Sequence, residues 1–192
     1  MNVIPGDMST TGLQGKILIS QPTANSSFFS NTVVLVCEHH AKGAWGLAMT
    51  KPSANMTVDQ LGADMGIPVN TGQPLYIGGP VQDDGLHFVH TPDVIVSNTL
   101  QITPDIYVTS SEAMLREIQA GRGPLHWRLF VGVCVWQAGQ LEGEMSGQPP
   151  WTPQHRWLTQ PCPRKIWNIP AKKLWSNQTD SAIQTSVKNF LE

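Results

Sequence analysis

Four histidines stand at the ends of two predicted strands, and histidine is the side chain that most readily moves protons or binds metals near neutral pH. His39 and His40 follow Glu38 at the end of a β-branched run, and His87 and His90 flank a second run. In an extended strand, adjacent residues such as His39 and His40 point to opposite faces, and so do His87 and His90, which are three apart. These spacings do not favour the converging ligands of a zinc site. No CxxC or HExxH spacing accompanies them. We expect ordinary turn or surface histidines, with no metal and no cofactor bound.

Nucleophilic catalysis would need a serine or cysteine beside a base, and the sequence offers one arrangement of this kind. Cys37 lies two residues before His39, on the same face if the strand continues to that residue. A thiol inside an apolar run has a raised pKa, which makes it a poor nucleophile. The GxSxG pattern of serine hydrolases is absent. The adjacent carboxylates Asp83 and Asp84 occur in QDDG, where we expect them to shape a hairpin turn.

The glycine pair Gly78-Gly79, followed by Pro80, comes directly after a predicted strand. Neither GxGxxG nor GxxxxGK[ST] is present, and proline lacks the amide that a phosphate-binding loop would use. Two residues without Cβ atoms permit a close approach of the backbone to another segment or to a ligand. Two interpretations therefore stay open, a binding loop and a tight crossing of two backbones.

The elements that position these residues are short strands with few helices between them. Apolar patterning predicts strands at 16–20, 32–37, 44–50, 75–77, 86–90, 99–102, 105–108 and 126–136. TVDQ from Thr57 and TSSE from Thr109 fit capping boxes and predict two helices, which end at Gly66 and Gly121. A helical turn is expected in QAGQLEGEM, and a last helix from Pro170. Runs of strands with few helices favour an α+β fold.

The chain has 192 residues, 40% hydrophobic and 14% charged, which suits one folded domain over 1–192 with a loose arm at 1–14. Its apolar runs are far shorter than the ~20 residues of a membrane-spanning helix, and the N-terminus lacks a signal-peptide pattern. Three cysteines do not suggest a disulfide framework, since Cys37 and Cys134 lie in apolar runs. We expect Cys162 to be exposed, and the protein to be cytoplasmic and without membrane association.

The C-terminal part of the chain carries most of the positive charge. Basic residues alternate there with tryptophans, a pattern that can hold single-stranded nucleic acid: Arg156, Arg164, Lys165, Lys172 and Lys173, with Trp151, Trp157, Trp167 and Trp175. The isoelectric point of about 6.3 is far below that of a dedicated DNA-binding domain. Because tryptophans beside a proline-rich loop more often cap a core, we expect weak or no nucleic-acid binding.

Several segments occur in the order typical of the YqgE/AlgH family: GKILISQP, VVLVCEHHAKGAWGLAMTKP, LYIGGPV, FVH, GVCVWQAGQLEGEM and IWNIPAKKLW. The resemblance covers about residues 13–185. It implies an α+β fold built on a coiled, bulged, largely antiparallel mixed sheet covered by a few helices. It also implies a bacterial cytosolic protein from a largely uncharacterised family, one branch of which is described as a transcriptional regulator of polysaccharide production.

The resemblance also identifies motif residues that could form a binding surface. We take as candidates the residues at three predicted turns and one after the last strong strand: Glu38, His39, Gly78, Gly79, Pro80, His90 and Gln140. The three turns stand at strand ends, and we expect them to lie together at one end of the sheet, where loops commonly bind ligands.

The sequence is compatible with two functions. The first is a non-enzymatic regulatory or binding protein whose partner, a protein or a small molecule, the sequence does not identify. The alternative is a small hydrolase in which Glu38 orients a histidine base, with His39 and His90 around one pocket. The hydrolase requires that three or more of the four side chains Glu38, His39, His90 and Gln140 meet in one cleft.

Overall fold

The computed structural model describes residues 12–20, 28–30, 32–146, 157–164 and 166–168. Its strands are β1 (Lys16–Ser20), β2 (Val33–His40), β3 (Gly43–Ala48), β4 (Pro52–Thr57), β5 (Pro74–Ile77), β6 (Val81–His90), β7 (Thr99–Thr103), β8 (Ile106–Thr109), β9 (Trp127–Gln137) and β10 (Trp157–Pro161). The helices are α1 (Val58–Asp64), α2 (Ala113–Gln119), α3 (Gln140–Ser146) and the 3₁₀ helix η1 (Ile166–Asn168). The predicted α+β class is confirmed.

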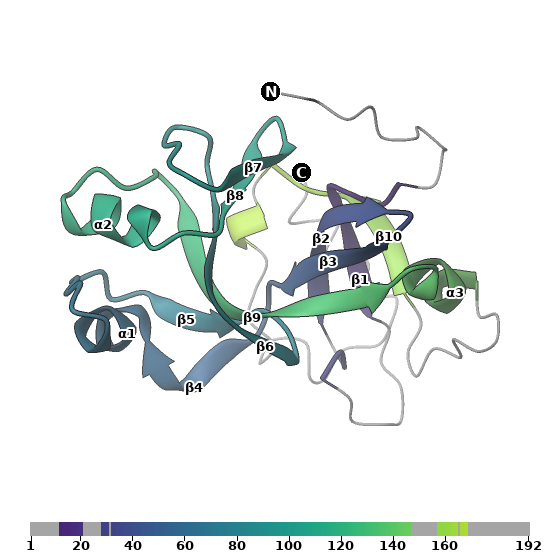
Figure 1. Ribbon diagram of the computed structural model, residues 1–192, viewed down its shortest axis with the longest axis horizontal. Coiled ribbons are helices and arrows are strands. Elements are labelled where there is room, and N and C mark those ends of the chain that lie inside the picture. Colours follow the sequence, from purple (N-terminus) through teal and green to yellow (C-terminus); the bar gives the residue numbers. More distant parts are fainter. Residues whose placement is uncertain (1–11, 21–27, 31, 147–156, 165, 169–192) are drawn as a thin grey trace.

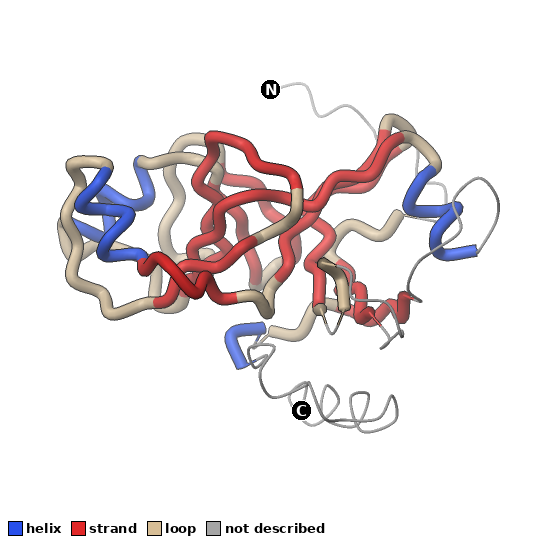
Figure 2. Tube along the Cα trace, turned by 90° about the horizontal axis from the view of Figure 1, so that it is seen from below, coloured by secondary structure: helices blue, strands red, loops and turns tan. Residues whose placement is uncertain are grey.

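One curled sheet runs through the molecule in the order β10-β1-β2-β3-β9-β6-β8-β7, with β5 pairing to β9 and β4 to β5. The pairing of β5 with β9 is parallel and the other pairings are antiparallel. Helices α1 and α2 lie at one end of the molecule and α3 at the other (Figures 1 and 2). None of the helices in the described part is long and apolar enough to cross a membrane.

Strand β9 joins the two halves of the sheet (Figure 1). Its second half pairs with β3, and its first half lies between β5 and β6. Residues three apart in a regular strand point to opposite faces, yet Phe130 and Val133 pack in the same core cluster. The strand therefore switches faces between them, at Gly132, whose φ of +76° is accessible to glycine without strain. This irregularity lets one strand contribute to all three core clusters of the described chain.

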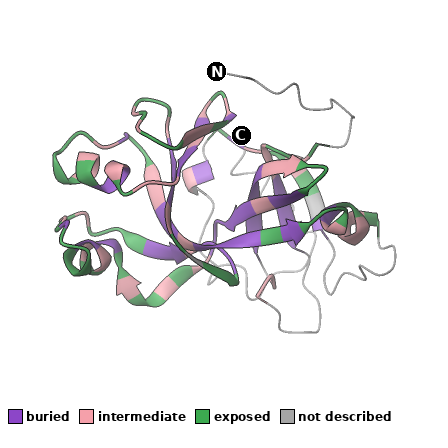
Figure 3. Cartoon of the chain, in the orientation of Figure 1, coloured by how far each residue is buried: buried purple, intermediate pink, exposed green. Residues whose placement is uncertain are grey.

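The apolar runs read from the sequence form the core of the molecule. Strands β1 and β2 are buried on both faces, as continuous apolar runs predict. Figure 3 shows the buried residues gathered on β1, β2 and β3 and where β9 crosses the sheet.

The two predicted capping boxes have opposite outcomes. Thr57 caps α1 as expected: its hydroxyl accepts the Gln60 amide, and the Gln60 side chain accepts the Thr57 amide. The second prediction is wrong, because Thr109 is the last residue of β8, and α2 begins after Glu112 without a side-chain cap. The Thr109 hydroxyl is used elsewhere, in hydrogen bonds with His90 and Thr99.

Three other expectations about the elements need correction or lie outside the described residues. The QDDG segment is part of β6 and not a hairpin turn, with irregular register between Val81 and Leu86. Strands β4 and β10 were not predicted, and each pairs with a strand that was, β5 and β1. The helix expected from Pro170 and residues 1–11 of the arm expected at 1–14 lie outside the described residues.

Candidate functional site

The Gly78-Gly79-Pro80 segment crosses directly over β9. A Cβ atom at Gly78 would meet the Gly132 carbonyl oxygen, and one at Gly79 would overlap the carbonyl group of Val133. The Gly78 amide donates to the Val131 carbonyl at 2.8 Å, and the Ala48 amide donates to the Gly78 carbonyl at 2.7 Å. The tight backbone crossing considered from the sequence is therefore present, and only glycine fits it.

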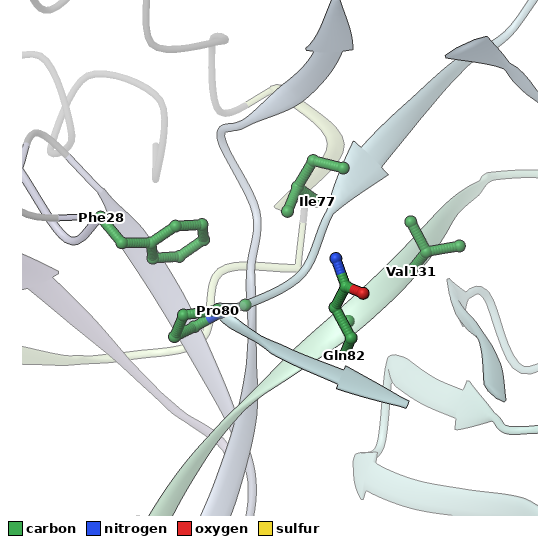
Figure 4. Close-up of a pocket in the computed structure, with 7 residues that line it drawn as sticks. Phe28, Ile77, Pro80, Gln82 and Val131 are labelled. Atoms are coloured by element: carbon green, nitrogen blue, oxygen red, sulfur yellow. The ribbon is translucent and has the colours of Figure 1, made fainter. Parts of the chain in front are cut away.

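This crossing borders a pocket of about 430 Å³, here called the GGP pocket. Its lining is apolar apart from main-chain atoms and one amide side chain: Phe28, Ile77, Gly79, Pro80, Gln82, Val131 and Gly132. Figure 4 shows the Gln82 amide beside Ile77 and Val131, with Phe28 across the pocket near Pro80. The ammonium group of Lys51 lies 4.4 Å from the centre of the Phe28 ring. Two predicted candidates, Gly79 and Pro80, thus line a real cavity.

Glu38 and His39 are engaged in hydrogen bonds at the end of β2. The Trp45 indole N–H donates to the Glu38 carboxylate. The Leu13 amide donates to His39 Nδ1 at 3.0 Å, so the ring proton resides on Nε2, which donates to Glu142 Oε1 at 2.7 Å. These contacts link β2 to β3, to the residues before β1 and to α3.

His90 is buried, which corrects the expectation of a turn or surface histidine. Its Nδ1 donates to the Thr91 carbonyl at 2.7 Å, and its Nε2 accepts the Thr109 hydroxyl at 2.7 Å. Burial lowers the pKa of His90, because the charged imidazolium loses its hydration, although the Thr91 carbonyl and Asp93 act in the opposite direction. His87 is also buried, with Nδ1 2.8 Å from the Ser110 hydroxyl.

The expectation that the three turns gather at one end of the sheet is wrong. Trp45 pairs with Glu38 on one side and with Val135 on the other. His90 pairs with Trp127, at the opposite end of β9. The two positions on β9 are eight residues apart, or about 27 Å at ~3.4 Å per residue along an extended strand. Glu38 and His90 therefore do not share a site.

Gln140 joins the Glu38 end and not the His90 end. Its side-chain oxygen accepts the Gln137 amide at 3.0 Å, and its side-chain nitrogen donates to Glu144 at 3.0 Å. Glu144 also accepts the indole N–H groups of Trp136 and Trp157, at 3.1 and 3.2 Å. This carboxylate anchors α3 to β9 and β10, a role that residue spacing alone does not reveal because it depends on the pairing that places β10 in the sheet.

The cysteines and the described residues of the predicted cationic stretch, Trp157, Arg164 and Trp167, have partners within the fold. The other residues of that stretch lie outside the described residues: Trp151, Arg156, Lys165, Lys172, Lys173 and Trp175. Cys37 and Cys134 are buried as expected, but Cys162 is half-buried, and burial raises its pKa to about 12. Trp157 is buried, and Arg164 forms an ion pair with Asp105 at 2.9 Å. Within the described ranges, no group of three His, Cys, Asp or Glu side chains could hold a metal ion.

A second pocket, of about 270 Å³, lies where β5 and β9 begin, and sequence reasoning missed it. Its main side chains are Tyr76, Leu125, His126, Arg128 and Trp167. We call it the Arg128 pocket. The sequence indicates this site only through residues 126–128, where a histidine, a tryptophan and an arginine follow one another at the start of a predicted strand. Trp167 reaches the pocket only through the long-range placement of η1.

Comparisons with known proteins agree with the motif order. A model of the AlgH-like family matches residues 17–184. A UPF0301 protein of Marinomonas sp. strain MWYL1 is 36% identical over 133 residues, which cover 67% of this chain and 70% of that protein. One from Photorhabdus laumondii is 31% identical over 171 residues, which cover 85% of this chain and 88% of that protein.

Two solved structures share the fold. The solution structure of the AlgH protein from Pseudomonas aeruginosa matches with a TM-score of 0.68 and 28% identity, over 92% of this chain and 95% of that one. The crystal structure of protein DIP2367 from Corynebacterium diphtheriae matches with a TM-score of 0.62, over 81% and 79% of the two chains. At 23% identity, this match supports a shared fold and nothing more. On the family match and the relatives together, this chain belongs to the AlgH-like family.

Proposed function

We propose that this chain is a non-enzymatic binding protein that holds a partner at the GGP pocket. The observation that carries the proposal is the pocket itself, since two residues identified from sequence motifs, Gly79 and Pro80, line it. Its volume of about 430 Å³ falls within the ~300–1,000 Å³ of typical ligand sites. A regulatory role, including one in transcription, would be exercised through the bound partner.

The lining indicates what kind of group the pocket suits. Phe28, Ile77 and Val131 present half-buried apolar surface, and the exposed Gln82 amide can both donate and accept hydrogen bonds. The main chain of Gly78 and Gly79 packs directly against that of β9, and the Gly78 amide donates to the Val131 carbonyl, so this wall of the pocket is held by main-chain contacts. An apolar side chain or small apolar group of a partner, flanked by one hydrogen-bonding atom, fits this description.

The hydrolase alternative has weaker geometric support. It places Glu38, His39 and His90 around one pocket, and the register of β9 separates Glu38 from His90. The Glu38 carboxylate accepts from Trp45, and both His39 ring nitrogens are used in hydrogen bonds with Leu13 and Glu142. Binding without catalysis is the function that uses the geometry as it stands.

A pair of matched variants tests the proposal. Gln82→Arg places a long charged side chain at the mouth of the GGP pocket, whereas Gln101→Arg makes the same change at an exposed position of β7, an edge strand of the sheet. A partner identified with the wild-type chain should be lost by Gln82→Arg and retained by Gln101→Arg, with both variants equally folded by circular dichroism. Equal retention by both variants would contradict the proposal, as would an esterase activity that His39→Ala abolishes without unfolding the chain.

A further inference from the structure

The Arg128 pocket combines a cation with aromatic walls, at the start of β9 and away from the GGP pocket. Strand β5 runs parallel to β9 with Tyr76 beside Phe130, which places Tyr76 on the same face as Arg128. Helix η1 brings Trp167 to the pocket lining, with its carbonyl accepting from Arg128. None of the described residues that line the pocket is acidic, so the lining carries net positive charge.

The Arg128 guanidinium is held in a defined orientation by three segments of the chain. It lies 4.9 Å from the centre of the Tyr76 ring, donates from Nη1 to the Met49 carbonyl at 3.0 Å and donates from Nη2 to the Trp167 carbonyl at 2.6 Å. Guanidinium carries five N–H donors, so arginine can bond to an anion while it keeps main-chain acceptors. Burial lowers the pKa of Arg128, and a bound anion would offset this cost because it favours the charged form.

The aromatic wall is also preorganised. The rings of His126 and Trp167 stack with centres 6.1 Å apart and planes 22° from parallel. The loop that carries His126 is pinned, since the His126 amide donates to the Thr91 hydroxyl at 3.2 Å and the Leu125 amide to Asp93 at 2.9 Å. Beside this wall the Leu125 side chain is 76% exposed, an apolar surface at the pocket mouth.

We propose that the Arg128 pocket binds a small planar carboxylate, with the carboxylate on the guanidinium and the flat apolar part against Trp167 and Leu125. Guanidinium is planar, carries its charge at every protein pH and is less strongly hydrated than an ammonium group, so it suits a carboxylate in a half-buried site. A volume of about 270 Å³ is some nine times the ~30 Å³ of a water molecule, room for a single ring and its acid group. This site shares no lining residue with the GGP pocket, so a test of benzoate binding here is independent of a test of the proposed function.

The test is a titration of the full chain with benzoate, followed by NMR of main-chain and indole N–H groups. Benzamide is the neutral control of the same shape, and inorganic phosphate is the anion without a flat part. Benzoate should shift the Trp167 indole and the amides of residues 125–128. Hydrogen bonds to charged groups imply that benzamide binds about ten- to a hundred-fold more weakly. Equal shifts with benzamide, or tighter binding of phosphate, would overturn the assignment of a planar carboxylate.

Two variants locate the site without disturbing Arg128, whose contacts also support the fold. Leu125→Glu places a negative charge at the pocket mouth and should weaken benzoate binding at least about five-fold through like-charge repulsion. The control Val135→Glu makes the same change at a residue that is 50% exposed at the other end of β9, and should leave binding unchanged. An unaffected Leu125→Glu variant would refute the proposal. So would the absence of shifts up to about ten millimolar benzoate, where a Kd of ~1 mM gives near saturation.

Discussion

His39 donates a hydrogen bond from Nε2 to Glu142 Oε1 at 2.7 Å, and this contact joins the end of β2 to α3 across 103 positions of sequence. The His39 side chain is only 4% exposed, while that of Glu142 is 44% exposed. On its other side His39 accepts the Leu13 amide at 3.0 Å. His39, a candidate ligand or base from its residue type, therefore connects three segments: the end of β2, α3 and the residues before β1.

Replacing His39 by phenylalanine should destabilise the chain. The change keeps a ring of similar width but removes both hydrogen bonds, one of them to a charged partner. The expected loss is about 1.5–4 kcal/mol in the free energy of unfolding, measured by urea denaturation. His40→Phe, at the exposed neighbouring position, is the control and should change stability by no more than ~0.5 kcal/mol. Equal effects of the two variants would contradict the role of the His39 hydrogen bonds in connecting the three segments.

Gly79→Ala should unfold the chain or destabilise it by more than ~3 kcal/mol, since the new methyl group would overlap the main chain of Val133. Backbone cannot move aside as a flexible side chain can, so relaxation would break the pairing of β6 with β9. The control Gly12→Ala adds the same methyl group where no atom lies within 4 Å. Thermal unfolding of both variants checks the prediction, and a stable Gly79→Ala protein would show that the crossing is looser than described.

Burial of His90 makes stability depend on pH. Its pKa in the folded chain is below the ordinary value of 6.5 because burial disfavours the imidazolium. Between these two pKa values the unfolded chain binds more protons than the folded chain, so the free energy of unfolding falls as pH falls below 6.5. The slope from this group cannot exceed about 1.4 kcal/mol per pH unit. Above pH ~7 its contribution is constant.

His90→Gln should flatten this dependence between pH 7.5 and 5, because glutamine has both a donor and an acceptor but does not titrate. Denaturation midpoints of the two proteins across that range provide the measurement. Carboxylates such as Asp59, whose pKa is lowered chiefly by the Thr71 amide, lose their contribution only near and below pH ~4. They therefore do not interfere. An unchanged slope in the variant would assign the effect to another group.

Elements with a local signal could be predicted from the sequence. The predicted strand at 16–20 coincides with β1, and the Thr57 capping box defines α1, because each depends on residues within one short segment. The hairpin of β2 and β3 also followed from a turn between two apolar runs. The family could be recognised because its motifs keep their order along the chain.

The arrangement of the candidate site could not be predicted, because it depends on contacts between distant segments. The face switch at Gly132 and the pairing of β9 with three strands decide that Glu38 and His90 lie far apart. The hydrogen bond of buried His90 is made with Thr109, for which the local sequence pattern predicts a helix start. Strand β10 reads locally as a proline- and tryptophan-rich loop and becomes a strand only through pairing with β1. Period and propensity carry no information about such pairings.

Glu144→Ala should loosen the α3 end of the molecule, because it removes the acceptor shared by the Trp136 and Trp157 indoles and the Gln140 amide. We expect a loss of about 2–5 kcal/mol in the free energy of unfolding, since hydrogen bonds to a charged acceptor contribute ~1.5–3 kcal/mol each but are not additive within one network. Hydrogen exchange should quicken in β10 and α3 before it changes in β6 or β8, because the lost contacts belong to the former pair.

Glu112→Ala is the matched control for this last prediction. Its carboxylate pairs with Arg116 at 3.1 Å with both side chains more than half exposed, and such surface pairs contribute about 0–1 kcal/mol. Glu144→Gln keeps the shape and one acceptor oxygen, so it should recover part of the loss. If Glu144→Ala were as mild as Glu112→Ala, the two tryptophans would be held by apolar packing alone, and the carboxylate would not be the anchor of α3.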